Sequence, residues 1–177
     1  MLVGLKGPLK RVAILFDASG SMQQTATGSD NNRWAEAQDI ASTWLQNLEI
    51  HKCVLIVFAS DIRTFPEDGS LADLRDGGTD NRMSLMKRLQ TVTPGGWTNT
   101  HDAMRKAYEY DVDTILLFSD GAPSKANSGV FDPSTAQKIY ELCREHQDIP
   151  VNTIGLGNYF DKNMSTFLRT VARMTGG

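Results

Sequence analysis

The chain has 177 residues, of which 40% are hydrophobic and 22% are charged, as is typical of one globular domain. Its formal net charge of -3 leaves no basic surface of the kind that binds nucleic acid. No apolar run approaches the roughly 20 residues needed to span a bilayer, and no signal peptide is recognisable. We therefore expect no membrane insertion, and a cytoplasmic location is favoured. One domain should span residues 1–177, with residues 1–10 as a leading segment.

Short apolar runs bounded by polar turns predict the strands. The runs are continuous and rich in β-branched residues, as strands buried on both faces of a parallel sheet should be. They lie at Val12–Phe16, Cys53–Phe58, Ile115–Phe118 and Val151–Ile154. Ile62–Phe65 follows the second run after a turn too short for a parallel crossover, so we expect an antiparallel edge strand there.

Apolar residues at helical spacing predict helices between these strands. The helical patterns cover residues 34–48, 83–89, 103–107, 133–143 and 164–171. Asn31 or Asn32, Asp132 and Asp161 are the expected caps. This alternation predicts an α/β domain of three layers, similar to a Rossmann fold. Its central sheet should be mostly parallel, with one antiparallel edge strand and helices on both faces.

Oxygen-bearing side chains gather where the strands end. Asp17, Ser19 and Ser21 follow the first strand, Asp120 follows the third, and Thr98 lies in a Gly-Gly-Trp-Thr-Asn-Thr loop. If the first and third strands are neighbours, about 4.8 Å apart, the two aspartates converge. Close carboxylates repel one another, and a divalent cation removes that conflict. Hydroxyl and carboxylate oxygens suit Mg²⁺, Mn²⁺ or Ca²⁺.

These segments, in this order, resemble the metal-ion-dependent adhesion site of the von Willebrand factor type A (VWA) domain family, whose fold integrin inserted domains share. The resemblance implies that Ser19, Ser21 and Thr98 would touch the metal through their hydroxyl oxygens. Asp17 and Asp120 would act mainly through bound waters, and Asp120 could move with ligand state. Such a metal keeps most of its charge and an open position, which favours a carboxylate from a partner's Asp or Glu.

The resemblance implies a divalent-cation-dependent protein-binding module for adhesion or complex assembly, and we expect a monomeric domain of a larger protein. A regulatory or scaffolding domain of an intracellular machine, for example beside an ATPase, is an alternative. A metal-dependent hydrolase with Ser19 as nucleophile is another, but Ser19 lacks a Gly-x-Ser-x-Gly elbow, so we expect no enzyme. Family members usually carry another strand after a closing Thr-Gly-Gly, so this chain could be truncated after residue 177.

Three residues beside the metal site are candidates for partner binding. Trp97 adjoins Thr98, and an exposed aromatic side chain there could be a binding hot spot. His101 and Asp102 follow on the same rim, although histidines are commonly solvated and the helix dipole favours a carboxylate at this position in any case. Selectivity is expected in the polar loops at residues 22–32 and 121–132. The cysteines, Cys53 and Cys143, are expected to be buried reduced thiols.

Overall fold

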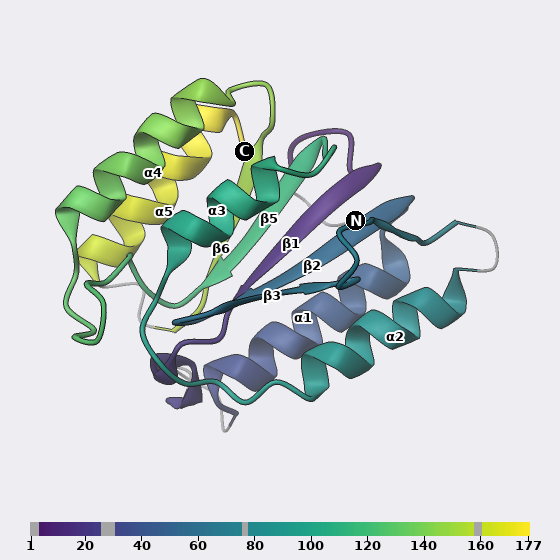
Figure 1. Ribbon diagram of the computed structural model, residues 1–177, viewed down its shortest axis with the longest axis horizontal. Coiled ribbons are helices and arrows are strands. Elements are labelled where there is room, and N and C mark those ends of the chain that lie inside the picture. Colours follow the sequence, from purple (N-terminus) through teal and green to yellow (C-terminus); the bar gives the residue numbers. More distant parts are fainter. Residues whose placement is uncertain (1–3, 26–30, 76–77, 158–160) are drawn as a thin grey trace.

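The computed structural model describes residues 4–25, 31–75, 78–157 and 161–177, and within these ranges it contains a six-stranded mixed sheet. The strand order is β3-β2-β1-β5-β6, and the short β4 also pairs with β2 (Figure 1). The strands are β1 (Arg11–Asp17), β2 (Lys52–Phe58), β3 (Ile62–Phe65), β4 (Ala72–Asp73), β5 (Thr114–Ser119) and β6 (Val151–Gly155). β1, β2, β5 and β6 are parallel, whereas β3 and β4 run antiparallel to β2. The predicted strands and the antiparallel edge are confirmed, and β4 is an addition to them.

The helices lie where the apolar spacing predicted them. They are α1 (Arg33–Asn47), α2 (Thr79–Gln90), α3 (Thr100–Tyr108), α4 (Pro133–Glu145) and α5 (Lys162–Thr175). Asn32, Asp132 and Asp161 cap α1, α4 and α5, because each side chain accepts a hydrogen bond from a main-chain N–H of the first turn. The cap of α3 is Asn99, whose side chain accepts a hydrogen bond from the Asp102 N–H.

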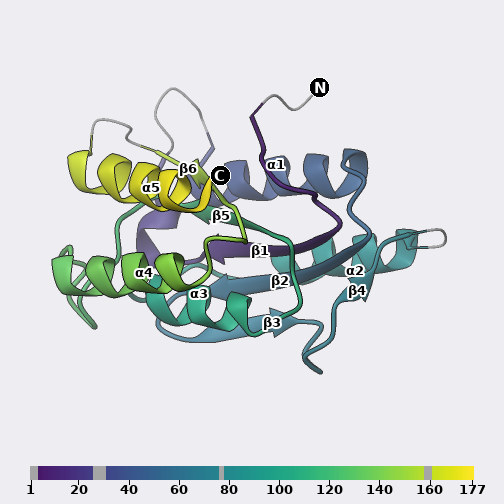
Figure 2. The same cartoon turned by 90° about the horizontal axis from the view of Figure 1, so that it is seen from above.

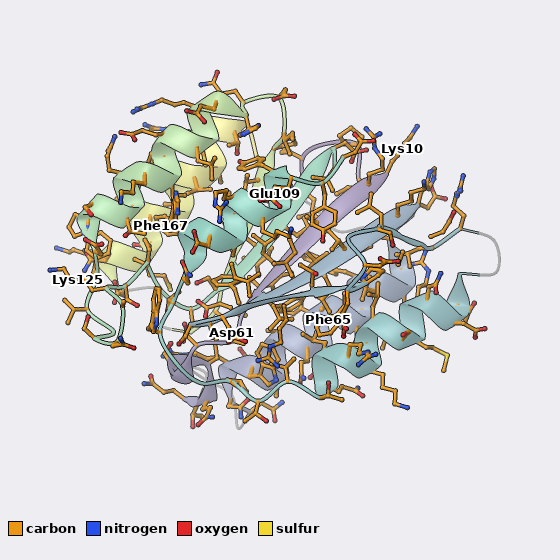
Figure 3. The ribbon with its side chains drawn as sticks, viewed as in Figure 1. Lys10, Asp61, Phe65, Glu109, Lys125 and Phe167 are labelled. Carbon is orange, nitrogen blue, oxygen red and sulfur yellow. The ribbon has the colours of Figure 1, made fainter. Side chains whose placement is uncertain are left out.

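The helices cover both faces of the sheet and bury a separate core on each. Alternate side chains of β1 point to opposite faces: Phe16 packs with α1 and α2, whereas Leu15 packs with α3, α4 and α5. In Figure 2, β1 lies between α1 and α3. Phe65 belongs to the first core and Phe167 to the second (Figure 3). The expected three-layer α/β fold is confirmed.

Aromatic rings fill the first core directly beneath the ends of β1 and β5. Phe16 and Phe118 stack with their ring centroids 4.6 Å apart, and Trp34 meets the edge of Phe16 at 6.3 Å. Trp44 packs on Phe118 at 5.4 Å. Trp34 and Trp44 are therefore core residues, and this tight packing gives the ends of β1 and β5 a rigid support.

Some local expectations need correction. The helical spacing favours Met83 on the buried face of α2, but its side chain is 62% exposed, and Leu85 and Leu89 are the buried residues. The segment at residues 22–32 begins inside a 3₁₀ helix, η1 (Gly20–Gln23), with Met22 fully buried. Residues 26–30 of that segment lie outside the described residues.

Both cysteines have the state that the sequence predicted. Cys53 and Cys143 are buried free thiols, and burial raises the pKa of Cys53 to about 12. Within the described ranges, no helix combines the length and the apolar character needed to cross a membrane.

Candidate functional site

The site lies where β1 and β5 end side by side. Phe16 is paired with Phe118 across the two parallel strands, so the last residues of these strands, Asp17 and Ser119, lie beside each other. Ser119 is followed by Asp120, and Asp17 by the turn that carries Ser19 and Ser21. Because β1 and β5 are neighbours, Asp17 and Asp120 converge, as the sequence predicted.

Asp17 forms the buried base of the site. Its side chain accepts a hydrogen bond from the Ser19 N–H at 2.9 Å and another from the Ser119 hydroxyl at 2.6 Å. Burial, reinforced by the nearby charge of Asp120, raises the pKa of Asp17 to about 6, although these hydrogen bonds favour its charged form. Asp17 thus holds the turn in place from below.

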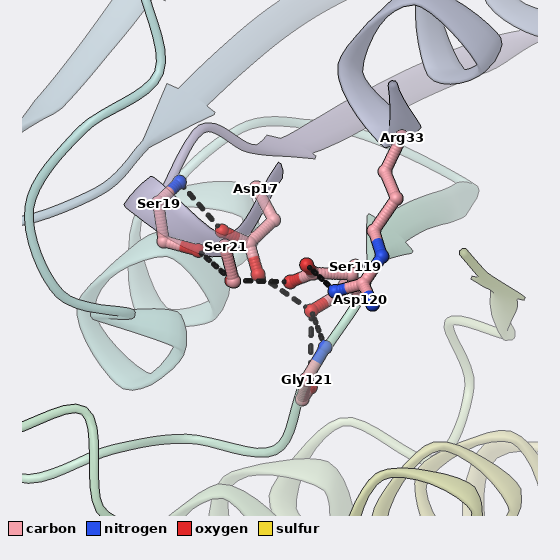
Figure 4. Close-up of polar contacts among 7 residues, drawn as sticks. All are labelled: Asp17, Ser19, Ser21, Arg33, Ser119, Asp120 and Gly121. Carbon is pink, nitrogen blue, oxygen red and sulfur yellow. Dashed lines mark hydrogen bonds and ion pairs between the residues drawn. The ribbon is translucent and has the colours of Figure 1, made fainter. Parts of the chain in front are cut away.

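Above Asp17, hydroxyl and carboxylate oxygens form a chain of close contacts (Figure 4). The hydroxyl oxygens of Ser19 and Ser21 are 3.1 Å apart, and Ser21 donates to Oδ1 of Asp120 at 2.9 Å. The other oxygen of Asp120, Oδ2, accepts a hydrogen bond from Nη1 of Arg33 at 2.7 Å. These contacts join residues from η1, α1 and the end of β5.

A glycine-containing loop brings Thr98 to the same place. The Gly95 N–H donates to the Ala18 carbonyl at 2.7 Å, and the Gly20 N–H donates to the Gly96 carbonyl at 3.1 Å, so the loop is tied to the turn after β1. The Thr98 N–H donates to the Ser124 hydroxyl at 3.1 Å. Thr98 is therefore positioned from two sides by its main chain.

Gly96 should be indispensable for this loop, and Gly96→Ala is expected to reduce the free energy of unfolding by about 1–2 kcal/mol. Its φ is +84°, and a Cβ there would lie 2.2 Å from the Ser60 hydroxyl, which itself accepts a hydrogen bond from the Trp97 N–H. Gly95→Ala is the matched control, because a Cβ at Gly95 meets nothing within 4 Å. Urea denaturation of both variants measures the difference, and equal stability would contradict the role given to Gly96.

These side chains surround a cavity of about 440 Å³. Its lining includes Ser19, Ser21, Thr98 and Asp120, whereas Asp17 lies beneath it. Trp97 lines both this cavity and a neighbouring one of about 310 Å³, whose lining includes His101 and Asp102. Nδ1 of His101 is 3.3 Å from Oδ1 of Asp102.

The donor set decides which ions the cavity could hold. Nowhere in the described ranges do three or more His, Cys, Asp or Glu side chains gather as metal ligands. The cavity instead presents the hydroxyls of Ser19, Ser21 and Thr98. Its carboxylates are the buried Asp120 and the exposed Asp161. All of these are hard oxygen donors, so the residues fit a cation such as Mg²⁺ or Mn²⁺ and do not fit zinc or copper.

Two residues of the site were missed from the sequence. In the sequence Ser119 is simply the residue before Asp120, but the pairing of β1 with β5 places its hydroxyl beside Asp17. The sequence only weakly indicates a role for Arg33. This residue is the first of α1, where the helix dipole disfavours a positive charge. A basic residue at that position indicates a partner elsewhere in the fold.

Comparison with known proteins identifies the family. A sequence model described as the von Willebrand factor type A domain matches residues 12–122, from β1 to just beyond Asp120. The chain belongs to this family. VWA domains are generally interaction modules rather than enzymes.

Individual relatives agree with this assignment. The human von Willebrand factor A domain-containing protein 3B is 30% identical over 105 residues, which is 59% of this VWA domain chain and only 7% of that protein. An aerotolerance-related membrane protein from Bacteroides fragilis has a similar structure, with a TM-score of 0.66 and 18% identity, over 95% of this chain and 89% of that one. The manganese-loaded TRAP protein of Plasmodium vivax matches with a TM-score of 0.58 and 17% identity, over 93% of this chain and 62% of that one. At these identities the two solved structures establish a shared fold.

Proposed function

We propose that this VWA domain binds a protein partner through a divalent cation held in the 440 Å³ cavity. The observation that carries the proposal is the oxygen chain from Ser19 through Ser21 to Asp120, with contacts of 3.1 and 2.9 Å. Thr98 adds a third hydroxyl to the lining. The Plasmodium vivax protein of similar fold was solved in a manganese-loaded form, which supports the choice of a divalent cation.

The hydroxyls of Ser19, Ser21 and Thr98 would hold the cation directly, with Asp17 and Asp120 acting through water. When bound, the cation supplies an electrophilic position for a carboxylate. Neutral hydroxyls leave most of the cation's charge uncompensated, so the partner's contribution would be an Asp or Glu side chain. Trp97, half-buried on the cavity wall, would add apolar contact area beside that carboxylate.

We propose binding rather than catalysis for this site. The Ser19 hydroxyl lies 3.1 Å from the Ser21 hydroxyl, and Asp17 accepts from the main-chain N–H of Ser19. The contacts of Ser19 are therefore those of a positioned ligand, and neither contact would serve to remove its proton as a general base does.

Titration with Mn²⁺, followed by calorimetry and by the melting temperature, tests the proposal. Wild-type protein should bind one equivalent, melt at a higher temperature when loaded, and lose the gain with EDTA. Thr98→Val should weaken binding at least about tenfold, since it removes one direct oxygen ligand. Thr43→Val, an exposed position on α1, is the matched control and should bind as the wild type does. A wild-type protein whose melting temperature ignores both Mn²⁺ and Mg²⁺ would contradict the proposal.

A further inference from the structure

Arg33 occupies a position that local helix preferences do not explain. It begins α1, where a positive charge meets the positive end of the helix dipole. The side chain nevertheless turns toward the cavity and is only 13% exposed. The position of Arg33 is therefore set by its partner at the end of β5.

That partner is fully enclosed. The Asp120 side chain is 0% exposed, and Arg33 Nη1 lies 2.7 Å from its Oδ2. Since Ser21 donates to Oδ1, both oxygens of Asp120 are satisfied by the protein itself. The guanidinium is also confined from behind, because a Cβ at Gly157 would lie 2.4 Å from Arg33 Nε. Arg33 thus holds one fixed place beside the oxygen chain.

The charges of this cluster show what Arg33 changes. Asp17 and Asp120 together carry two negative charges, and Arg33 adds one positive charge, so the cluster has one net negative charge. A divalent cation would bring the cluster to one positive charge with Arg33 present, and to neutrality without it. Asp161, the remaining acid on the described cavity wall, is exposed and caps α5, so solvent screens its charge.

We propose, on the basis of the function proposed above, that Arg33 sets the charge balance of the site. It takes the place of the divalent cation at Asp120 when that cation is absent, and it leaves the loaded site with an excess positive charge for an acidic ligand. Arg33 therefore has two opposite effects. It weakens the binding of the metal, and it strengthens the later binding of the partner's carboxylate to the metal-loaded site.

Two titrations of Arg33→Gln test these opposite effects on metal and carboxylate binding. Free Mn²⁺ is measured by electron paramagnetic resonance, and acetate binding to the Mn²⁺-loaded protein is measured by the loss of water proton relaxation. Removing the charge should tighten Mn²⁺ binding about tenfold and weaken acetate binding about threefold or more. Arg11→Gln is the matched control: Arg11 also pairs with aspartates, but at the opposite end of β1, and both affinities should stay as in the wild type.

The outcomes separate this inference from the proposed function. A wild-type protein that binds no Mn²⁺ contradicts the function itself. If the wild type binds Mn²⁺ but Arg33→Gln binds it equally or more weakly, Arg33 is merely structural and the inference fails. Arg33→Lys decides the matter if the glutamine variant does not fold: it keeps the charge, so its Mn²⁺ affinity should stay within about threefold of the wild type. A larger departure in either direction would overturn the inference.

Discussion

Replacing Asp120 with alanine is expected to lower the free energy of unfolding of the metal-free domain by about 3 kcal/mol. The substitution removes a carboxylate that is 0% exposed and leaves the guanidinium of Arg33, only 13% exposed, without its 2.7 Å partner. It also frees the Ser21 hydroxyl. A largely buried cation that has lost its counter-charge is costly because water replaces the lost interaction only in part. Urea denaturation in the presence of EDTA measures the effect.

A double-mutant cycle shows whether the cost comes from the stranded charge. Asp120→Ala combined with Arg33→Met should recover at least about 1 kcal/mol relative to Asp120→Ala alone, because the guanidinium left without its carboxylate is also removed. Asp111→Ala is the control, since Asp111 pairs with Arg11 but is 82% exposed, and its loss should cost less than about 1 kcal/mol. Additive losses for Asp120 and Arg33 would show that the two side chains do not stabilise each other.

The main architecture could be predicted from the sequence because burial on both faces leaves a simple pattern. The continuous apolar runs at β1, β2, β5 and β6 are typical of the central strands of a parallel sheet, and the short turn before β3 allows only an antiparallel partner. The positions of Asp17 and Asp120 follow directly from that arrangement, because parallel strands end at one edge.

Other features depend on tertiary contacts that leave little trace in the sequence. β4 has two residues and exists only because β2 offers an edge to pair with. Met22 is buried by η1 although its sequence neighbours are polar. The pairing of Arg33 with Asp120 joins residues 87 positions apart and depends on how α1 is oriented on the sheet. No local pattern specifies that orientation.

Asp17→Asn is expected to stabilise the metal-free domain while removing its response to divalent cations. Burial raises the pKa of Asp17 to about 6 from an ordinary value of 3.8, so the folded protein binds this proton more tightly than the unfolded chain does. Stability from this group is therefore fully present below pH 3.8 and is lost as the pH rises to about 6. The difference corresponds to about 3 kcal/mol at neutral pH. Asparagine can still accept from the Ser19 N–H, and the Ser119 hydroxyl can donate to the Gly121 carbonyl instead.

Denaturation of both proteins in EDTA between pH 4 and pH 8 measures this gain. The two stability curves should nearly coincide at pH 4 and separate progressively up to about pH 6, with the asparagine variant above the wild type. Addition of Mn²⁺ at pH 7 should then stabilise the wild type and leave Asp17→Asn unchanged, because the variant lacks a negative charge beneath the cavity. A variant less stable than the wild type at pH 7 would show that the charged form of Asp17 stabilises the metal-free fold. Opposite effects on stability and metal response would mean that the charge of Asp17 is kept for binding at the expense of stability, as expected for a functional residue.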